Sequence, residues 1–426
     1  MDKLRELLLS ASFIMLRNVP ALIVLDGWWW CDIYIPLDID DLRSLLEDDE
    51  PRVIILNQEY SFVGSEGTTT ADGCRPDSNT CADDGVTYDN AALDYIYVKS
   101  NKTLIGEGDA EIVNGTGLYL QGGVENVIIQ NVWLTNVNPE QFIVTGYDAA
   151  GRVTISNNEF DGITSWLASC NHEHYWTMLF LGADDQITLA NNYIHDTSGR
   201  SPKVGGSGSI TMHAVNNYWQ NNLGHAFDIA EGAYVLIEGN VFDNVTTVIT
   251  DDSASEGGYI FNVPSSSEST CSEYLDRECI DNTYTDSTSP ADYSDTDVFG
   301  NMTTASSIWE AMAVDEVASY VVENAGIGKL SSSSSSVSIS SASAVGLGTS
   351  SAASISSTAG ITYSATNGYS ATGGCILTVT AASASSTGNP SFSTTSQGGP
   401  SQQDFNFYGD FQGNFAAHKR RHAVGH

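Results

Sequence analysis

Ile187-Thr-Leu-Ala-Asn-Asn192-Tyr-Ile194 is one copy of a short template that the middle of this chain repeats. Apolar residues stand five and three positions before the second asparagine and two positions after it, which is the alternation of a strand with one buried face. The other copies are Asn126-Val-Ile-Ile-Gln-Asn131-Val-Trp133, Val153-Thr-Ile-Ser-Asn-Asn158-Glu-Phe160, Met212-His-Ala-Val-Asn-Asn217-Tyr-Trp219 and Val235-Leu-Ile-Glu-Gly-Asn240-Val-Phe242. Only Asn126 departs from the apolar pattern.

The aligned asparagines recur at short and similar intervals along the chain. This period is too short for a domain and is typical of one coil of a solenoid. Helical patterns between the strands are nearly absent, so α/β crossovers are not expected. The pattern predicts an all-β chain folded as a right-handed parallel β-helix, with asparagines stacked at successive bends. The alternative is a β-sandwich, whose hairpin signals would recur about every 8 to 12 residues.

Helices are expected at the two ends of this solenoid. Residues 38–50 predict a short capping helix, with acidic residues at its start and Leu42, Leu45 and Leu46 on one face. A terminal coil needs such a cover because its apolar cross-section is otherwise exposed. A final helix is expected over residues 305–325, with four apolar residues on one face: Ile308, Met312, Val317 and Val321.

Composition divides the chain into three parts. Residues 1–36 are an uncertain segment, either a poor signal peptide or a gene-model start, and their apolar run is shorter than the roughly 20 residues of a membrane span. Residues 37–330 hold the β-helix domain. Residues 331–426 are dominated by Ser, Thr, Ala and Gly and end in a short basic run. Such a composition predicts a disordered tail, since it cannot bury enough apolar surface to fold.

The chain carries 53 acidic and 16 basic residues, a formal net charge of −37. A field of this sign repels nucleic acid and other polyanions. A polyuronide ligand is therefore easier to accommodate in neutralised form, although the acidity is also explained as a device that keeps a secreted protein soluble. Against this background, Ser198-Gly-Arg-Ser-Pro-Lys-Val204 places two cations three positions apart, and we interpret it as a candidate functional site.

Seven cysteines and four N-glycosylation sequons, at Asn101, Asn114, Asn244 and Asn301, predict a secreted glycoprotein. Cys271 and Cys279 are close enough in sequence to close a small loop. An odd number of cysteines leaves at least one thiol unpaired within the chain.

Residues 40–329 resemble fungal or oomycete pectin lyases of the pectate-lyase superfamily. The resemblance rests on several motifs in register: Glu66-Gly-Thr-Thr-Thr70, Ser100-Asn-Lys-Thr-Leu-Ile-Gly-Glu-Gly108, Asn126-Val-Ile-Ile-Gln-Asn131, His174-Tyr-Trp176, Ser198-Gly-Arg-Ser-Pro-Lys-Val204, His213-Ala-Val-Asn-Asn-Tyr-Trp219, Gly224-His-Ala-Phe227 and Glu231-Gly-Ala-Tyr-Val-Leu236. It implies a parallel β-helix that cleaves methyl-esterified homogalacturonan within the chain by β-elimination. A secreted monomer that degrades plant cell-wall pectin is expected.

The resemblance also implies residue roles. Arg200 corresponds to the family's catalytic arginine, and Tyr175 and Trp176 match its aromatic substrate platform, with His174 and Lys203 as further substrate-binding residues. The alternative for the two aromatics is a place in the core of a coil. Because no cluster of aspartates is recognisable, neither a metal nor another cofactor is expected.

Arg200 is an awkward base, since a guanidinium keeps its proton beyond about pH 12. Desolvation and the like charge of Lys203 would together ease formation of a neutral arginine. Alternatively, Arg200 stabilises the developing enolate while another group takes the proton. The sequence does not separate these two hypotheses.

One departure from the family concerns a whole coil. After Asn138-Pro-Glu140 this chain continues directly with Gln141, whereas the family has a further coil that carries an aspartate and an arginine of the catalytic groove. Three hypotheses follow: a pectin lyase, a catalytically impaired pectin-binding relative or truncated gene model, and a β-helical surface adhesin. By analogy Cys81 pairs with Cys170 and Cys271 with Cys279. Cys31, Cys74 and Cys375 have no assigned partner.

Overall fold

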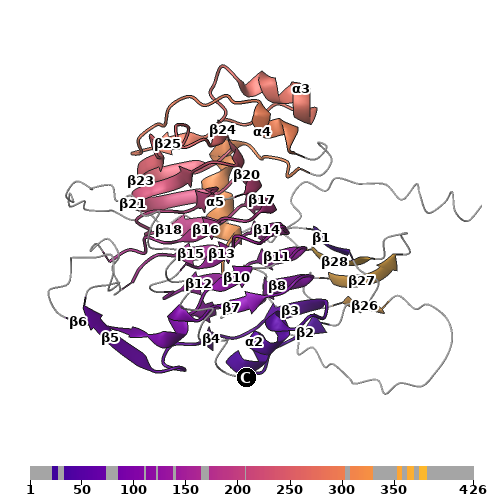
Figure 1. Cartoon of the computed structure of the whole chain (residues 1–426). Coiled ribbons are helices and arrows are strands. Elements are labelled where there is room, and N and C mark those ends of the chain that lie inside the picture. Colours follow the sequence, from indigo (N-terminus) through magenta and orange to yellow (C-terminus); the bar gives the residue numbers. More distant parts are fainter. Residues whose placement is uncertain are drawn as a thin grey trace, which may run out of the picture. The chain divides into compact units, whose positions relative to one another are not determined.

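The computed structural model describes residues 22–26, 33–72, 85–109, 112–120, 123–137, 141–164, 172–206, 208–302, 308–329, 353–356, 362–368 and 374–380. Most of the described chain winds into a right-handed parallel β-helix, in which each coil contributes up to three short strands (Figure 1). This confirms the predicted fold class. No helix among the described residues is long and apolar enough to span a membrane.

One face of the β-helix is a parallel sheet of nine strands, called here the first sheet. Its strands, in order along the stack, are β2 (Ile33–Tyr34), β3 (Arg52–Leu56), β8 (Lys102–Gly106), β11 (Val127–Gln130), β14 (Arg152–Ser156), β17 (Asp184–Ala190), β20 (Ser209–Val215), β22 (Ala233–Glu238) and β24 (Tyr259–Phe261).

The other two faces are arms of a second sheet that meet in β21 (Tyr218–Ile229). The first arm contains β4 (Tyr60–Ser61), β9 (Ile112–Asn114), β12 (Trp133–Thr135), β15 (Glu159–Asp161) and β18 (Tyr193–His195), and continues beyond β21 with β23 (Val241–Ile249) and β25 (Thr283–Thr285). The second arm contains β7 (Ile96–Val98), β10 (Leu118–Leu120), β13 (Ile143–Thr145), β16 (Met178–Phe180) and β19 (Lys203–Val204).

Two smaller sheets complete the described strands. β5 (Thr68–Asp72) and β6 (Gly85–Asp89) form an antiparallel hairpin. A four-stranded antiparallel sheet has the order β1 (Leu22–Asp26), β28 (Gly374–Thr380), β27 (Thr362–Gly368) and β26 (Ala353–Ser356). β26, β27 and β28 lie in the segment 331–426, for which the composition predicts a disordered tail. The rest of that segment lies outside the described residues, so its disorder stays a prediction.

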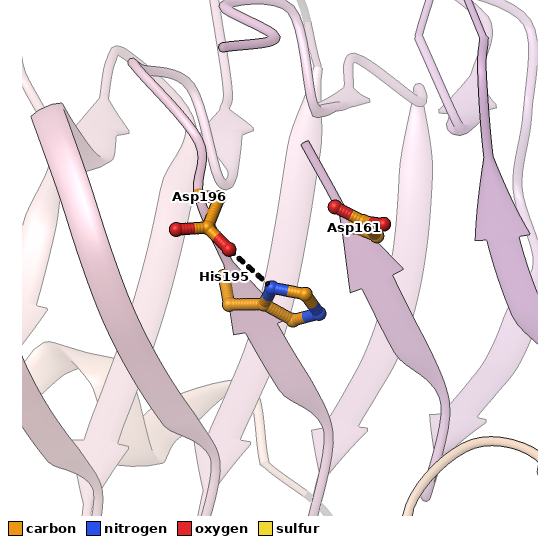
Figure 2. A group of neighbouring side chains, drawn as sticks. All are labelled: Asp161, His195 and Asp196. Atoms are coloured by element: carbon orange, nitrogen blue, oxygen red, sulfur yellow. Dashed lines mark hydrogen bonds and ion pairs between the residues drawn. The ribbon is translucent and has the colours of Figure 1, made fainter. Parts of the chain in front are cut away.

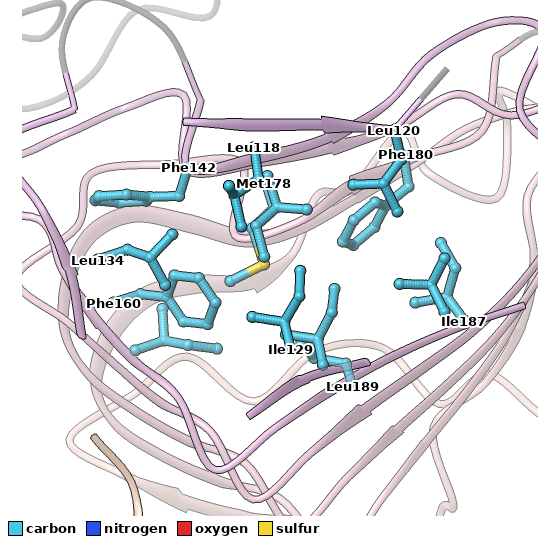
Figure 3. Packing of buried hydrophobic residues seen from close by; sticks show 14 of the residues in the cluster. Leu118, Leu120, Ile129, Leu134, Phe142, Phe160, Met178, Phe180, Ile187 and Leu189 are labelled. Carbon is cyan, nitrogen blue, oxygen red and sulfur yellow. The ribbon is translucent and has the colours of Figure 1, made fainter. Parts of the chain in front are cut away.

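The core runs along the inside of the coils as one contiguous cluster of buried apolar side chains. Figure 3 shows a section through it, in which side chains from all three faces meet. The residues labelled there are Leu118, Leu120, Ile129, Leu134, Phe142, Phe160, Met178, Phe180, Ile187 and Leu189. Every second residue of a strand points inward, so the alternation in the sequence becomes this layered interior.

Asparagine carboxamides stack at the bend between the first sheet and the first arm. Nδ2 of Asn158 donates to Oδ1 of Asn192 at 3.2 Å, and the series continues through Asn217 and Asn240 to Asn282 at 2.9 to 3.1 Å. The backbone N–H of each donor residue also donates to the next side-chain oxygen. The predicted ladder is confirmed, and Asn282 extends it by one coil that the repeat alignment did not include.

The alignment of Asn131 with Asn158 is wrong by one residue. The pairing of β11 with β14 places Val132 at the position of Asn158, and the Val132 N–H donates to Asn158 Oδ1 at 3.0 Å. Asn131 instead has a left-handed backbone, with φ of 53°, as Asn157 has at 57°. With Val132 as the reference, the apolar residues keep their spacing, and the exception at Asn126 disappears.

The two ends confirm one predicted helix and shorten the other. Helix α2 (Ile39–Glu47) packs its three leucines on the first coil, and the Asp38 side chain caps it by accepting a hydrogen bond from the Asp41 N–H at 2.9 Å. Near the other end lie η2 (Glu268–Cys271), α3 (Ser272–Leu275) and α4 (Asp297–Gly300), and η1 (Asn90–Leu93) precedes β7.

Among the described residues of the predicted 305–325, helix α5 covers Val314–Asn324; residues 305–307 lie outside the described ones. Met312 lies before it because its N–H and carbonyl bond to the Asn216 side chain, at 2.9 and 3.4 Å, instead of to a helical turn. Val317 and Val321 are buried against Tyr218 and its neighbours, so α5 runs along the outside of the coils (Figure 1).

Candidate active site

Arg200 lies in the loop that joins β18 of the first arm to β19 of the second. Its backbone is left-handed, with φ of 42°, a conformation that a non-glycine residue adopts at a cost. Contacts on both sides fix it: the Met178 N–H donates to the Arg200 carbonyl at 2.9 Å, and the buried Ser201 receives hydrogen bonds from Trp219 Nε1 and Asn222 Nδ2 at 2.8 and 2.9 Å. Neighbouring coils therefore hold the loop in place.

Gly199 allows an aromatic ring to lie against this loop. A Cβ atom at Gly199 would come within 2.6 Å of the Tyr175 ring, so only glycine fits there. The guanidinium carbon of Arg200 stands 5.6 Å from the centre of the same ring, within the range of a cation–π contact. The structure thus brings together Arg200 and Tyr175, which lie about one repeat apart in the sequence.

A carboxylate that the sequence reasoning missed lies between the two predicted cations. Asp228, on β21, has both oxygens 2.8 Å from Lys203 Nζ and its Oδ2 3.5 Å from Arg200 Nε. Burial raises the pKa of Asp228, but Lys203 and Arg200 outweigh burial and hold that pKa below its usual value. The sequence held only a weak signal: Asp228 follows Lys203 by the same interval by which Asn217 follows Asn192, but the intervals between other repeats differ.

The other predicted substrate-binding residues differ in exposure. Tyr175 and Lys203 are partly exposed, whereas Trp176 is 6% and His174 is 2% exposed. His174 packs edge-on against Phe142, with ring centres 5.0 Å apart. Trp176 meets Tyr175 edge-on at 5.6 Å. Trp176 and His174 are therefore buried, Trp176 against the Tyr175 ring and His174 against Phe142.

A second carboxyl group shares the field of the same cations. Burial, Asp252 and Asp228 raise the pKa of Glu256, while Lys203 and Arg200 act in the opposite direction. Glu256 lies in the turn between β23 and β24, one coil beyond β21. Asp228 contacts both cations directly, and Glu256 interacts with them electrostatically.

Asp161, His195 and Asp196 form a second charged cluster, on the first arm and the loop after it (Figure 2). Among the described residues, this is the one group of at least three His, Cys, Asp or Glu residues whose ligand atoms all lie within 4.8 Å of one another, as a metal site would need. His195 Nδ1 lies 2.8 Å from Asp196 Oδ2, and its Nε2 lies 3.2 Å from Glu159 Oε1. The sequence reasoning did not find this cluster.

The contacts in this cluster favour a protonated His195 over a bound metal ion. Burial lowers the pKa of His195, but hydrogen bonds to Asp196 and Glu159 outweigh it and raise the pKa to about 9. A metal ligand must be a neutral imidazole with a free nitrogen, whereas both ring nitrogens here face carboxylates. We therefore interpret the cluster as an ion-paired imidazolium that joins adjacent coils.

The predicted disulfide between Cys271 and Cys279 is present. Arg277, inside the loop that it closes, pairs with the fully buried Glu238, which also accepts from His213 Nε2 at 2.7 Å. Burial raises the pKa of Glu238, but Arg277 and His213 outweigh it and lower that pKa to about 2. Cys31, Cys74, Cys81 and Cys170 lie outside the described residues, and the side chain of Cys375 is not among those described.

The four sequons divide into two pairs by exposure. Asn244 and Asn301 are exposed, whereas Asn101 and Asn114 are partly buried. Each of the latter accepts a hydrogen bond from the next coil, from Asn126 at 2.9 Å and from Asn136 at 3.0 Å. Glycosylation stays a prediction at all four positions.

Comparisons of the sequence with known proteins agree on one family. A model of the pectate lyase family matches residues 143–330. A probable pectin lyase F from Emericella nidulans is 44% identical over 354 residues, covering 70% of this chain and 73% of the relative. A probable pectin lyase F from Aspergillus oryzae is 43% identical over 357 residues, covering 71% and 82%. Pectate lyase II from Xanthomonas campestris, a solved structure, has a TM-score of 0.43 at 17% identity, covering 72% of this chain and 96% of that one.

Proposed function

This chain belongs to the pectin lyases of the pectate-lyase superfamily, and from that premise we propose that it cleaves methyl-esterified homogalacturonan at the site around Arg200. The observation that carries the proposal is the pair of partly exposed cations, Arg200 and Lys203, beside the Tyr175 ring. In a chain of net charge −37, this is a place where a developing negative charge on a substrate is stabilised.

The reaction is a β-elimination within one uronate ester. A base removes the C5 proton, the electron pair of that C–H bond forms the C4–C5 double bond, and the C4–O4 bond breaks so that O4 leaves and takes up a proton. Negative charge develops on the ester carbonyl oxygen at C6. A guanidinium aimed at that oxygen lowers the barrier, because fixed charges act strongly in a partly desolvated site.

The position of Asp228 favours one of the two hypotheses for Arg200, which are that it is the base or that it stabilises the enolate. Its carboxylate lies against both cations, and an opposite charge favours the charged form of each partner. The contact therefore supports Arg200 as the group that stabilises the enolate, and speaks against the hypothesis that Lys203 eases formation of a neutral arginine. Lys203, fixed by the same carboxylate, is proposed to bind the uronate, and the Tyr175 ring to stack on a sugar face.

The shortened coil supports a second candidate, a relative that binds pectin but cleaves it poorly. The second arm is continuous across the predicted deletion, since β13 pairs directly with β10 on one side and β16 on the other; residues 138–140 lie outside the described ones. The alignment with the Emericella relative spans 354 positions but covers only 70% of the 426 residues of this chain, which is fewer than 354. Some aligned positions of that relative therefore have no counterpart in this chain. Neighbouring coils of a solenoid can restack after such a loss.

The test is cleavage of esterified pectin, followed by the ultraviolet absorbance of the unsaturated product. Arg200→Lys should lower the rate at least ~100-fold, the scale for a positioned acid–base or charged group. Arg152→Lys is the matched control, because Arg152 is 58% exposed in a surface ion pair and should leave the rate unchanged. EDTA should also leave it unchanged. Activity that is indifferent to Arg200→Lys would refute the assignment.

A companion variant separates the two candidates. Insertion of the family coil between Glu140 and Gln141 should restore the absent aspartate and arginine, and with them activity that depends on Arg200. Pectin affinity without product in the natural chain, followed by product after the insertion, would favour the impaired relative.

We further propose an extracellular monomer whose lyase domain spans residues 37–330. The disulfide between Cys271 and Cys279 supports an oxidising compartment, as do the exposed sequons at Asn244 and Asn301. Mass measurement of the secreted protein before and after glycosidase treatment tests both compartment and glycosylation.

A further inference from the structure

We propose that Asp228 is a positioning residue of the lyase site, which holds Arg200 and Lys203 in one rigid array and sets the net charge that the substrate meets. The proposal rests on the proposed function of Arg200. It concerns a residue that touches the two cations and not the reacting atoms.

The position of Asp228 follows from strand register. β19 pairs with β21 so that Lys203 lies directly beside Asp228, and side chains at paired positions of parallel strands leave the sheet on the same face. Both carboxylate oxygens are 2.8 Å from Lys203 Nζ. The Asp228 N–H also donates to the Pro202 carbonyl at 3.1 Å. Backbone and side chain of one residue thus fix the turn that carries both cations.

Each of the three charged side chains is mostly buried and exposes a small part of its surface. Exposure is 11% for Arg200, 14% for Lys203 and 13% for Asp228. Two cations this close, with little water around them, repel each other unless an anion lies between them. Asp228 supplies that anion, and the array of three groups has a net charge of +1 where the two cations alone would have +2.

The guanidinium of Arg200 needs a contact of its own, in addition to the contacts that hold the backbone of this residue. Its left-handed conformation, with φ of 42°, is held by surrounding contacts, and the Asp228 carboxylate is the one side-chain ion pair to Arg200 among the described residues. Without that contact the guanidinium would sample other rotamers. A displacement of about 1 Å at a reacting centre can cost on the order of 100-fold in rate.

The proposal predicts two effects of opposite sign for Asp228→Asn, which keeps the shape and removes the charge. First, kcat on esterified pectin should fall at least ~10-fold, with a smaller change in KM, because the guanidinium is no longer fixed. Second, de-esterified trigalacturonate should bind about tenfold more tightly at low salt, because the net charge of the array rises by one unit. This gain should shrink as salt is raised.

The matched control is Asp243→Asn. Asp243 lies on β23 of the first arm and accepts hydrogen bonds from Tyr218 Oη and Gln220 Nε2, at 2.9 and 3.1 Å. Its loss should lower the melting temperature and leave both kcat and trigalacturonate affinity unchanged. A variant of Asp228 that merely misfolds would lose rate and affinity together.

The two readouts also separate this inference from the proposed function. Slower cleavage together with tighter trigalacturonate binding supports the inference. If the natural chain gives no unsaturated product, the proposed function fails, while the affinity measurement still tests the array. If the chain is active and Asp228→Asn changes neither kcat nor affinity more than about twofold, the inference is overturned.

Discussion

Replacement of Asn192 by alanine should destabilise the β-helix far more than an ordinary surface substitution. The Asn192 side chain is fully buried and makes four hydrogen bonds. Its Oδ1 accepts from the N–H and Nδ2 of Asn158, at 3.0 and 3.2 Å. Its Nδ2 donates to the Ile155 carbonyl and to Asn217 Oδ1, both at 2.9 Å. Each bond crosses from one coil to the next.

The magnitude follows from these four bonds. A hydrogen bond contributes about 1 kcal/mol net, and a buried polar group left without a partner costs about 1–3 kcal/mol. Alanine leaves polar atoms of Asn158, Ile155 and Asn217 short of a partner, so the free energy of unfolding should fall by about 4 kcal/mol or more. For a domain of this size each kcal/mol corresponds to roughly 2–4 °C, which gives a fall in Tm of about 8–16 °C.

The assay is thermal and urea unfolding of the purified protein, with Asn244→Ala as control. Asn244 belongs to an outer row, is exposed, and its Nδ2 donates to Asn221 Oδ1 at 3.0 Å; its loss should cost less than about 1 kcal/mol. Equal effects of the two substitutions, or a loss below about 1 kcal/mol for Asn192→Ala, would refute the view that the buried ladder stabilises the stack.

Three further predictions concern stability. The pKa of His195 is about 9 in the fold against an ordinary 6.5. Its contribution to the free energy of unfolding is therefore complete below pH 6.5 and is lost as the pH rises through 9. Urea titrations should show that the free energy of unfolding falls by roughly 3 kcal/mol over this range, and that this fall is absent in His195→Gln. Arg277→Ala should cost about 3–5 kcal/mol, because it removes a charged partner of the buried Glu238, whereas Arg152→Ala should cost at most about 1 kcal/mol. A chain that ends at Leu330 lacks β26 to β28 but should keep the Tm of the β-helix; a fall of several degrees would show that the tail stabilises the domain.

The fold class could be predicted because its signal is local. Alternation within a strand and a recurring asparagine are each read from a few consecutive residues, as at Ile187 to Asn192, and they are the cause of the buried face and the bend. The capping helix could also be predicted, because Asp38 and the three leucines of α2 act within one short segment. The extent of α5 was not, because the Asn216 side chain competes for the backbone of Met312.

The sequence did not predict which residues of neighbouring coils lie side by side. The repeat alignment matches Asn131 with Asn158 because both are asparagines. The hydrogen bonds between β11 and β14 match backbone positions instead, and they place Val132 beside Asn158. The intervals between repeats also vary, since the step from Asn158 to Asn192 is longer than the step from Asn217 to Asn240. The neighbour of a given side chain therefore cannot be counted off along the chain.

The candidate site shows the same division. Arg200 and Lys203 stood out in the sequence because cations are rare in it, and a resemblance in motif gave them roles. Asp228 comes from the coil after Lys203, and Glu159 and Asp161 come from the coil before His195, whereas Asp196 directly follows His195 in the chain. All four are ordinary acidic residues among 53. Which of them faces a cation is decided by how the strands pair, since a shift of one residue turns a side chain to the opposite face of the sheet.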